Sequence, residues 1–158
     1  MIRQVAVIRC RRTGRWAFNP MGTFKGYGGY VGIYPYRELG VGATALQIGR
    51  LVEQLLAKSG PTGVHIRDHS SYEASAADDR TRATCEWAAP AGLTTSSSAK
   101  RFLQGGIETQ DKSKSRLVYR YEYDPSIRSL VQVEPGERVR KSAGAEALGE
   151  QIRRMLWL

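Results

Sequence analysis

Two stretches of the chain, one hundred positions apart, carry the same pattern: residues 45–56 read ALQIGRLVEQLL and residues 145–156 read AEALGEQIRRML. Apolar residues recur in both with the spacing of one face of an α-helix. A glycine stands at the same place in each, Gly49 in the first and Gly149 in the second. Because a glycine inside a helix costs about 1 kcal/mol relative to alanine, each one predicts the close approach of another backbone. The repetition predicts two similar helices in two related halves.

The ends of these helices can be placed from local signals. Thr44 followed by Gln47 has the spacing of a capping box, in which each side chain satisfies a free backbone N–H of the first turn. We therefore expect the first helix from about Thr44 to Lys58. The second is expected from about Ser142 to Leu158.

Short runs of strand-forming residues precede each helix. In the first half, the apolar run Val5–Ile8 predicts a strand buried on both faces, and Thr13-Gly14 predicts a hairpin turn into a second strand over residues 15–18. Residues 19–22, NPMG, indicate a further turn, and a third strand is expected over residues 30–36.

In the second half, Ser98 is expected to cap a short helix, AKRFLQGG. The alternation of Leu117, Tyr119, Tyr121 and Tyr123 predicts a strand, and residues 128–135 predict the strand that returns beside it. The pattern as a whole predicts an α+β fold with a mixed or antiparallel sheet and two main helices. We expect a single domain over residues 1–158, with related halves 1–60 and 98–158 joined by the Ala/Ser-rich segment 61–97.

The composition describes a globular protein, with 41% hydrophobic and 25% charged residues among 158. No run approaches the ~18 consecutive apolar residues of a membrane helix, and the N-terminus lacks the features of a signal peptide. The two cysteines, Cys10 and Cys85, are expected to be free thiols. Together these features predict a cytoplasmic protein.

The net charge of +9 is unevenly distributed along the chain. Residues 1–60 hold nine Lys/Arg against two Asp/Glu, whereas residues 61–99 hold three against five. The basic first third favours one candidate function, binding of nucleic acid, in which cations contact phosphates and nearby aromatic residues such as Trp16 stack on bases. The alternative is that the aromatic residues pack inward and the cations are only solvated. The candidate basic surface consists of Arg11, Arg12, Arg15 and Lys25.

Catalytic and metal sites receive little support from the sequence. His65 and His69 in HIRDH would share a face if the segment were helical, and Cys85 or Glu73 would have to supply a third metal ligand. The segment favours a strand or loop instead, and no nucleophile stands beside a paired base. We therefore expect no enzyme activity, no cofactor and no metal.

Two motifs resemble a known family. In residues 98–109, SAKRFLQGGIET, the positions Ser98, Lys100, Phe102 and Gly105 fit a Ser-x-Lys-x-Phe-x-x-Gly pattern. Residues 131–156 fit a strand, a Pro-containing connector and a helix that bears Leu148-Gly149, and residues 28–56 are similar to the same unit. These motifs resemble the immunity proteins of bacterial contact-dependent growth inhibition (CDI), which neutralise a toxin domain delivered by a neighbouring cell.

The resemblance implies a non-enzymatic protein whose partner is the C-terminal domain of a cognate CDI toxin, with a nuclease as the expected toxin. The basic net charge departs from the acidic character of many such immunity proteins. If the toxin has a basic cleft, the acidic segment would meet it, with carboxylates and aromatic anchors of the kind that interfaces favour. If the toxin surface is acidic, the hairpin around Arg11, Arg12 and Arg15, together with Lys25, would form the interface. The candidate residues of the acidic segment are Tyr72, Glu73, Asp78, Asp79, Glu86 and Trp87.

Overall fold

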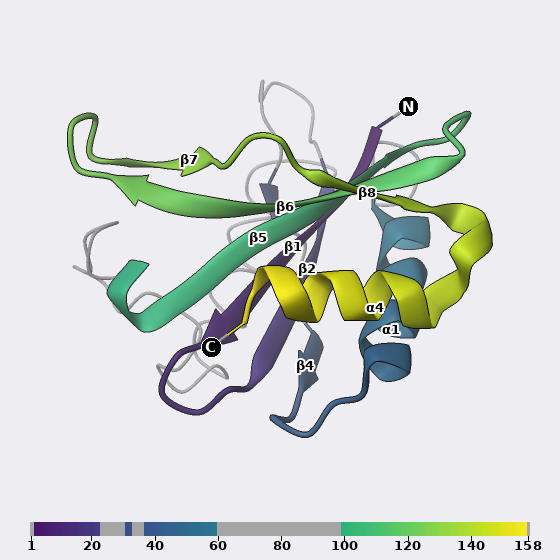
Figure 1. Ribbon diagram of the computed structural model, residues 1–158, viewed down its shortest axis with the longest axis horizontal. Coiled ribbons are helices and arrows are strands. Elements are labelled where there is room, and N and C mark those ends of the chain that lie inside the picture. Colours follow the sequence, from purple (N-terminus) through teal and green to yellow (C-terminus); the bar gives the residue numbers. More distant parts are fainter. Residues whose placement is uncertain (1, 23–30, 33–36, 60–98, 158) are drawn as a thin grey trace, which may run out of the picture.

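The computed structural model of this chain describes residues 2–22, 31–32, 37–59 and 99–157 (Figure 1). These residues form an α+β fold with an antiparallel sheet and two main helices, as predicted, and both helices lie on one face of the sheet. The elements are β1 (Ile2–Cys10), β2 (Trp16–Gly22), β3 (Val31–Gly32), β4 (Arg37–Leu39), α1 (Ala45–Lys58), β5 (Phe102–Gln110), β6 (Ser115–Asp124), β7 (Ser129–Gln132), β8 (Glu137–Arg140), the 3-10 turn η1 (Lys141–Ala143) and α4 (Gly144–Met155).

The sheet has eight strands in the order β3-β2-β1-β5-β6-β7, with β4 also paired to β2 and β8 also paired to β6. The apolar strand β1 lies between β2 and β5 and so is not at an edge of the sheet. Val5 and Val7 are buried, whereas Ala6 and Ile8 are half-buried, so the predicted burial on both faces is confirmed for one face only. No helix of the described ranges is long and apolar enough to cross a membrane.

Strand pairing repeats in the two halves with an offset of one hundred residues. Within the first half Gln4 pairs with Met21, and within the second Gln104 pairs with Tyr121. The outer strands follow the same rule, because Trp16↔Leu39 and Met21↔Gly32 correspond to Arg116↔Val139 and Tyr121↔Gln132. The halves join where β1 meets β5, with Ala6 opposite Gly106. An approximate two-fold axis between these two residues therefore relates the strand pairings of the halves.

The two internal glycines lie at the contact between α1 and α4. A Cβ atom built on Gly49 would stand 1.7 Å from the carbonyl oxygen of Ala145, and one built on Gly149 would stand 1.7 Å from that of Ala45. The contact is reciprocal, as the two-fold relation requires. The prediction that each glycine allows another backbone to approach is confirmed.

The shared core consists of equivalent residues from both halves. Val7 and Ile107, Phe18 and Val118, Ile48 and Leu148, and Val52 and Ile152 are all fully buried in one cluster between the sheet and the helices. Full burial of one such side chain contributes roughly 1.5–3 kcal/mol, so this cluster is the main source of stability.

Helix α1 starts and ends as the sequence predicts. The Thr44 hydroxyl accepts a hydrogen bond from the Gln47 backbone N–H at 3.2 Å, and the Thr44 N–H donates to the Gln47 side-chain oxygen at 2.8 Å. The capping box is therefore confirmed. Helix α4 begins after η1 and ends at Met155, three residues before the predicted end at Leu158.

Two predictions of local structure are wrong. Residues 19–22 belong to β2 rather than to a turn, because the chain stays extended beside β1: Asn19, Pro20 and Met21 pair with Ala6, Val5 and Gln4. The short helix predicted over residues 99–106 is wrong in its larger part. Residues 99–101 are helical, but β5 begins at Phe102 and includes the remaining residues.

The sheet position of β5 explains why its sequence was misread. Gly106 lies against the ring of Tyr119, and an added Cβ atom would stand 2.5 Å from the Tyr119 hydroxyl oxygen. Gly105 and Gly106 of β5 therefore leave space for Tyr119 of the neighbouring strand and do not end a helix. Of the third strand expected over residues 30–36, the structure describes β3 alone.

Candidate functional site

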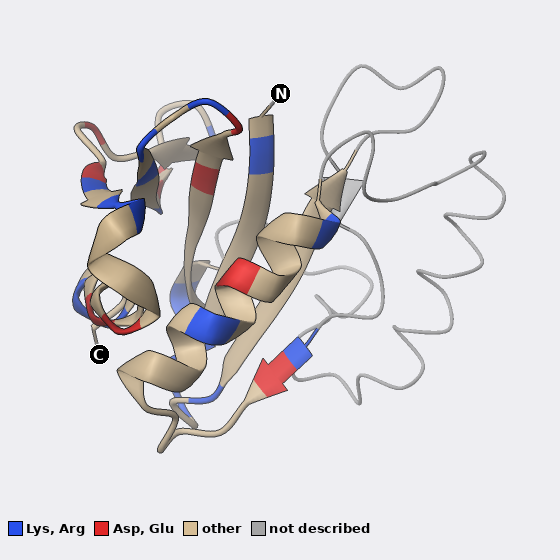
Figure 2. Cartoon of the chain, turned by 90° about the vertical axis from the view of Figure 1, so that its right-hand side faces the viewer, with Lys and Arg blue, Asp and Glu red and all other residues tan. Residues whose placement is uncertain are grey.

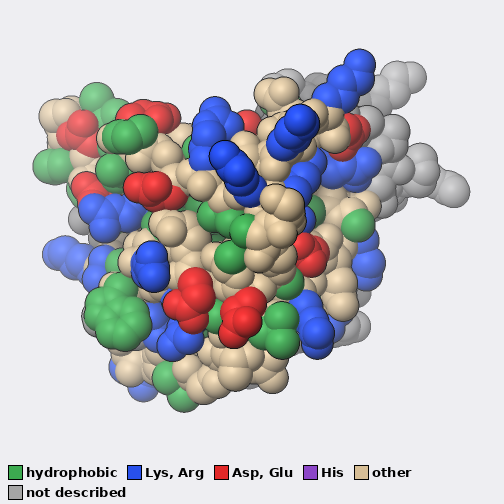
Figure 3. Space-filling model, turned by 45° about the vertical axis from the view of Figure 1, so that its right-hand side comes forward, with side chains coloured by type: hydrophobic (Ala, Val, Ile, Leu, Met, Phe, Trp, Pro, Cys, Tyr) green, Lys and Arg blue, Asp and Glu red, His purple; other side chains and the backbone are tan. Residues whose placement is uncertain are grey.

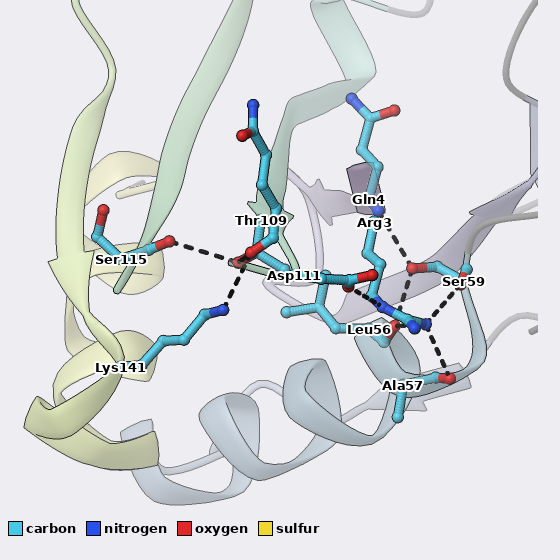
Figure 4. A network of polar contacts seen from close by, with 10 residues as sticks. Arg3, Gln4, Leu56, Ala57, Ser59, Thr109, Asp111, Ser115 and Lys141 are labelled. Atoms are coloured by element: carbon cyan, nitrogen blue, oxygen red, sulfur yellow. Dashed lines mark hydrogen bonds and ion pairs between the residues drawn. The ribbon is translucent and has the colours of Figure 1, made fainter. Parts of the chain in front are cut away.

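The two helices end over opposite ends of the central strand pair, and these two ends are built differently. At the first, Arg3 of β1 reaches the last turn of α1 and donates from Nη1 to the carbonyl oxygens of Ser59, Ala57 and Leu56, at 3.1, 3.4 and 3.5 Å (Figure 4). A cation is favourable here because the helix dipole places partial negative charge at its C-terminus.

An ion pair completes this end. The Arg3 Nε atom lies 2.8 Å from an Asp111 carboxylate oxygen. The hydrogen bond from Arg3 lowers the pKa of Asp111 below its usual value. Beside them, the buried Ser59 hydroxyl accepts from the Gln4 backbone N–H at 3.1 Å and donates to the Leu56 carbonyl at 3.0 Å. We call this arrangement of Arg3, Asp111 and Ser59 the closed end of the sheet.

At the equivalent place in the second half these groups are replaced. The one-hundred-residue offset puts Leu103 where Arg3 stands and Arg11 where Asp111 stands, so the ion pair cannot form. A hollow of about 500 Å³ opens there, and Leu103 and Arg11 both line it. We call this the open end. Further lining residues are Phe102, Arg120, Tyr121, Glu122, Tyr123 and Trp157.

The C-terminus of α4 is capped by a side chain that does not line the hollow. Arg9, also from β1, donates to the Leu156 carbonyl oxygen at 3.0 Å and stacks over the ring of Trp16 at 4.4 Å. Burial, and to a lesser extent the nearby charge of Arg153, lowers the pKa of Arg9. An arginine of β1 therefore caps the C-terminus of each helix, Arg3 at α1 and Arg9 at α4. Arg3 also occupies the space beside α1, whereas the hollow remains beside α4.

Aromatic side chains mark the open end. Trp157 follows the end of α4 and is 70% exposed, whereas its equivalent in the first half is Ala57. Tyr121 packs edge-on against the buried ring of Tyr119, with centroids 5.5 Å apart. Tryptophan, tyrosine and arginine are the residues enriched at the energetic centres of protein interfaces. The open end therefore has the composition of a protein-binding site.

The charges around the hollow are mixed. Arg120 forms an ion pair with Glu122 on β6, and the Arg11 Nε atom donates to the Ala99 carbonyl oxygen at 3.3 Å. A rim that carries both signs around an aromatic centre suits a protein partner better than a polyanion. Figure 2 shows that acidic and basic residues also alternate along α1, so the exposed side of that helix has no single charge.

The structure places only some of the residues predicted from the sequence. Among the basic candidates, Arg11 lines the hollow, Arg12 is exposed, and Arg15 forms an ion pair with Glu38. Trp16, considered for base stacking, is 1% exposed and packs in the core, so the inward alternative holds for it. Lys25 and the acidic-segment candidates Tyr72, Glu73, Asp78, Asp79, Glu86 and Trp87 lie outside the described residues.

The metal-site candidates also lie outside the described residues: His65, Glu73, His69 and Cys85. In the ranges that the structure does describe, no group of three His, Cys, Asp or Glu side chains is close enough to hold a metal ion.

Sequence reasoning missed the open end, although a signal for it was present. Extending the repeat from the helices to the strands would have paired Arg3 with Leu103, Asp111 with Arg11, and Ala57 with Trp157. These are large changes in size and charge between equivalent positions of two otherwise similar halves. Such differences point to the place where one half does something that the other does not.

Comparison with known proteins adds a likeness of fold. No protein-family model matches the chain, and no curated protein matches it in sequence. A solved protein of unknown function from Neisseria meningitidis is similar with a TM-score of 0.70 and 14% identity, over 99% of this chain and 94% of the other. A chain of the CdiA-CT/CdiI toxin and immunity complex from Yersinia pseudotuberculosis is similar with a TM-score of 0.65 and 9% identity, over 99% of this chain and 96% of the other.

Proposed function

We propose that this chain is a non-enzymatic immunity protein of a CDI system, which binds the C-terminal domain of its cognate toxin in the cytoplasm and neutralises it. The observation that carries the proposal is the fold likeness to a chain of a toxin–immunity complex over 99% of the present chain. The motifs at residues 98–109 and 131–156 support the same role.

The open end is the proposed toxin-binding site. Its hollow of about 500 Å³ is large enough to take apolar side chains from a partner, and the 70% exposed Trp157 stands at its rim. Burying a tryptophan removes a large apolar area from water, and such anchors dominate the binding energy of many interfaces. Binding at the open end would inhibit the toxin because this chain would cover the toxin's active site or block the access of its substrate.

The acidic segment remains a second proposed contact, for a toxin that is a nuclease. A nuclease binds phosphates through a basic cleft, and the carboxylates of Glu73, Asp78, Asp79 and Glu86 would complement that cleft, with Tyr72 or Trp87 as anchor. The reversal Asp78→Lys with Asp79→Lys should then slow association and weaken binding. Unchanged affinity would remove this segment from the interface.

A titration with the purified toxin domain tests the main proposal. The toxin domain is taken from the large exported protein expected to be encoded beside this chain, and its binding is measured by calorimetry. We expect tight binding to the wild-type chain and a loss of tenfold or more for Trp157→Ala, since an interface anchor contributes about 2 kcal/mol or more.

Ile127→Ala is the matched control, because Ile127 is 59% exposed and does not line the hollow. It should bind the toxin domain as the wild type does. If the wild-type chain fails to bind the domain, the immunity function is wrong. If Trp157→Ala and Ile127→Ala bind equally well, the function stands but the interface lies elsewhere.

A further inference from the structure

A second surface of the molecule gathers basic side chains on the β5–β6 turn and on β8. Strand pairing sets Arg140 opposite Ser115 and Arg138 opposite Leu117, and the Lys141 backbone N–H donates to the Lys114 carbonyl at 2.9 Å. Figure 3 shows Lys and Arg side chains gathered over these elements. We call this the β8 basic surface; its members are Lys112, Lys114, Arg138, Arg140 and Lys141.

These cations lack acidic partners among the described residues. Lys112, Lys114, Arg138 and Arg140 are exposed and form no ion pair there, and the Lys141 ammonium donates to a backbone carbonyl, that of Gln110, at 3.1 Å.

Three acids lie nearby, and none forms an ion pair with these cations among the described residues. Asp111 is engaged by Arg3, and Glu137 neighbours Arg138 on β8. Glu108 of β5 lies on the face of Arg138, with Leu117 of β6 between the two residues. Because successive side chains of a strand point to opposite faces, Glu137 points away from the face that carries Arg138 and Arg140. The surface therefore keeps a concentrated positive charge.

The first half has no such surface at the equivalent place. The five positions correspond to Arg12, Gly14, Glu38, Gly40 and Val41, which carry one positive and one negative charge. Glu38 moreover forms an ion pair with Arg15. Since the shared fold is built without these cations in one half, packing of the fold does not account for them in the other.

The chemistry of the surface selects its partner. None of the large hydrophobic side chains that the described part exposes belongs to the β5–β6 turn or to β8, so the apolar centre of a protein interface is missing. Contact with a phosphate backbone requires only cations, and the absence of aromatic residues from these five positions leaves no platform for base stacking.

We propose that the β8 basic surface binds the phosphate backbone of nucleic acid, for which RNA is the probe, without sequence preference. Glu122 at the open end lies eight positions after Lys114, which directly precedes β6, a span of about 26 Å at the rise of a strand. RNA on this surface therefore leaves the open end free, and the proposal does not depend on the immunity function.

Fluorescence anisotropy with a labelled single-stranded RNA of mixed sequence tests this on the purified chain alone. Affinity of the wild type should fall steeply between about 50 and 200 mM salt, with a slope of log K against log salt of up to about −3.5 for five phosphate contacts. The variant with Lys112→Ser, Lys114→Ser, Arg138→Ser and Arg140→Ser should lose most of that slope and bind at least tenfold more weakly.

The control removes the same charge from scattered exposed positions through Arg12→Ser, Arg37→Ser, Arg50→Ser and Lys100→Ser. Both variants lower the net charge from +9 to +5, so net charge alone would weaken RNA binding equally. Equal loss in the two variants, at an unchanged melting temperature, would overturn the proposal. Binding of a polyglutamate peptide as tight as that of RNA would overturn it in favour of an acidic protein partner.

Discussion

The described parts of residues 2–58 and residues 101–157 form the same scaffold, yet the two ends of its sheet are completed in different ways. Both halves pair their strands at equivalent positions and press one helix glycine against the backbone of the other helix. Where the halves agree, the residues are small or buried and serve packing. At the ends of the sheet they differ in residues that reach the surface, and this difference separates the requirements of the fold from those of binding.

The closed end shows how the scaffold is completed when nothing has to bind there. Arg3 satisfies three carbonyl groups and pairs with Asp111. At the open end, Leu103 and Arg11 leave a hollow and Trp157 remains exposed. Tryptophan is among the residues enriched at the energetic centres of protein interfaces, and this one lies beside a hollow.

The largest expected effect comes from disrupting the contact between α1 and α4, to which both halves contribute a glycine. Gly49→Ala and Gly149→Ala should each destabilise the protein by about 2–3 kcal/mol, because the new methyl group would overlap a backbone carbonyl of the facing helix. Since the two contacts are reciprocal, the losses should be similar, and thermal unfolding measures both. Gly42→Ala is the control, with no atom within 4 Å of the added carbon. Tolerance of either helix substitution at the level of Gly42→Ala would contradict the packing described.

A second variant breaks the closed end. Arg3→Leu places there the residue type of the open end and removes the ion pair and the contacts to the carbonyl groups of the last turn of α1. We expect a loss of about 2 kcal/mol in the free energy of unfolding by denaturant, as for other hydrogen bonds to charged groups. A loss below about 0.5 kcal/mol would show that the closed end contributes no more than an ordinary surface position.

The reverse exchange closes the open end. Leu103→Arg combined with Arg11→Asp installs the residue pair of the closed end, which should occupy the hollow. Affinity for the toxin domain should fall about tenfold or more, equivalent to about 1.4 kcal/mol. Calorimetry measures this affinity, and thermal unfolding measures the stability lost with the packing of Leu103 against the core. Unchanged affinity of this double variant for the toxin domain would show that the toxin does not bind at the open end.

The smallest expected effect concerns the ionisation of the Tyr119 hydroxyl, at a position where the first half has no titratable side chain. Burial raises the pKa of the Tyr119 hydroxyl, whose equivalent in the first half is Asn19. A raised pKa in the folded state adds stability that is fully present below the unfolded value of about 10 and is lost as the pH rises above it. Tyr119→Phe should therefore flatten the fall of melting temperature with rising pH above about 10. Tyr123→Phe serves as control, and identical alkaline profiles for the two would contradict this role of burial.

The sequence predicted the elements whose patterns are long or whose signals are local. The helices follow from apolar spacing, the start of α1 from the Thr44 capping box, and their close contact from the glycines. Strands β4 and β8 have three and four residues, too few to display a period. The first part of strand β5 was predicted as a helix. The role of its glycines is to leave space for the Tyr119 ring, and this ring comes from another strand. The open end depends on residues from five parts of the chain, so only the alignment of the halves points to it. The acidic-segment candidates remain predictions.

Hydrogen–deuterium exchange of the chain with and without its toxin domain tests the comparison most directly, because both ends of the sheet are read in one experiment. Bound toxin should slow exchange at the open end, in residues 120–123 and 156–157. The closed end, at residues 3 and 56–59, should exchange as in the free protein. Protection at the closed end, or equal protection at both ends, would contradict the assignment of binding to the end where the halves differ.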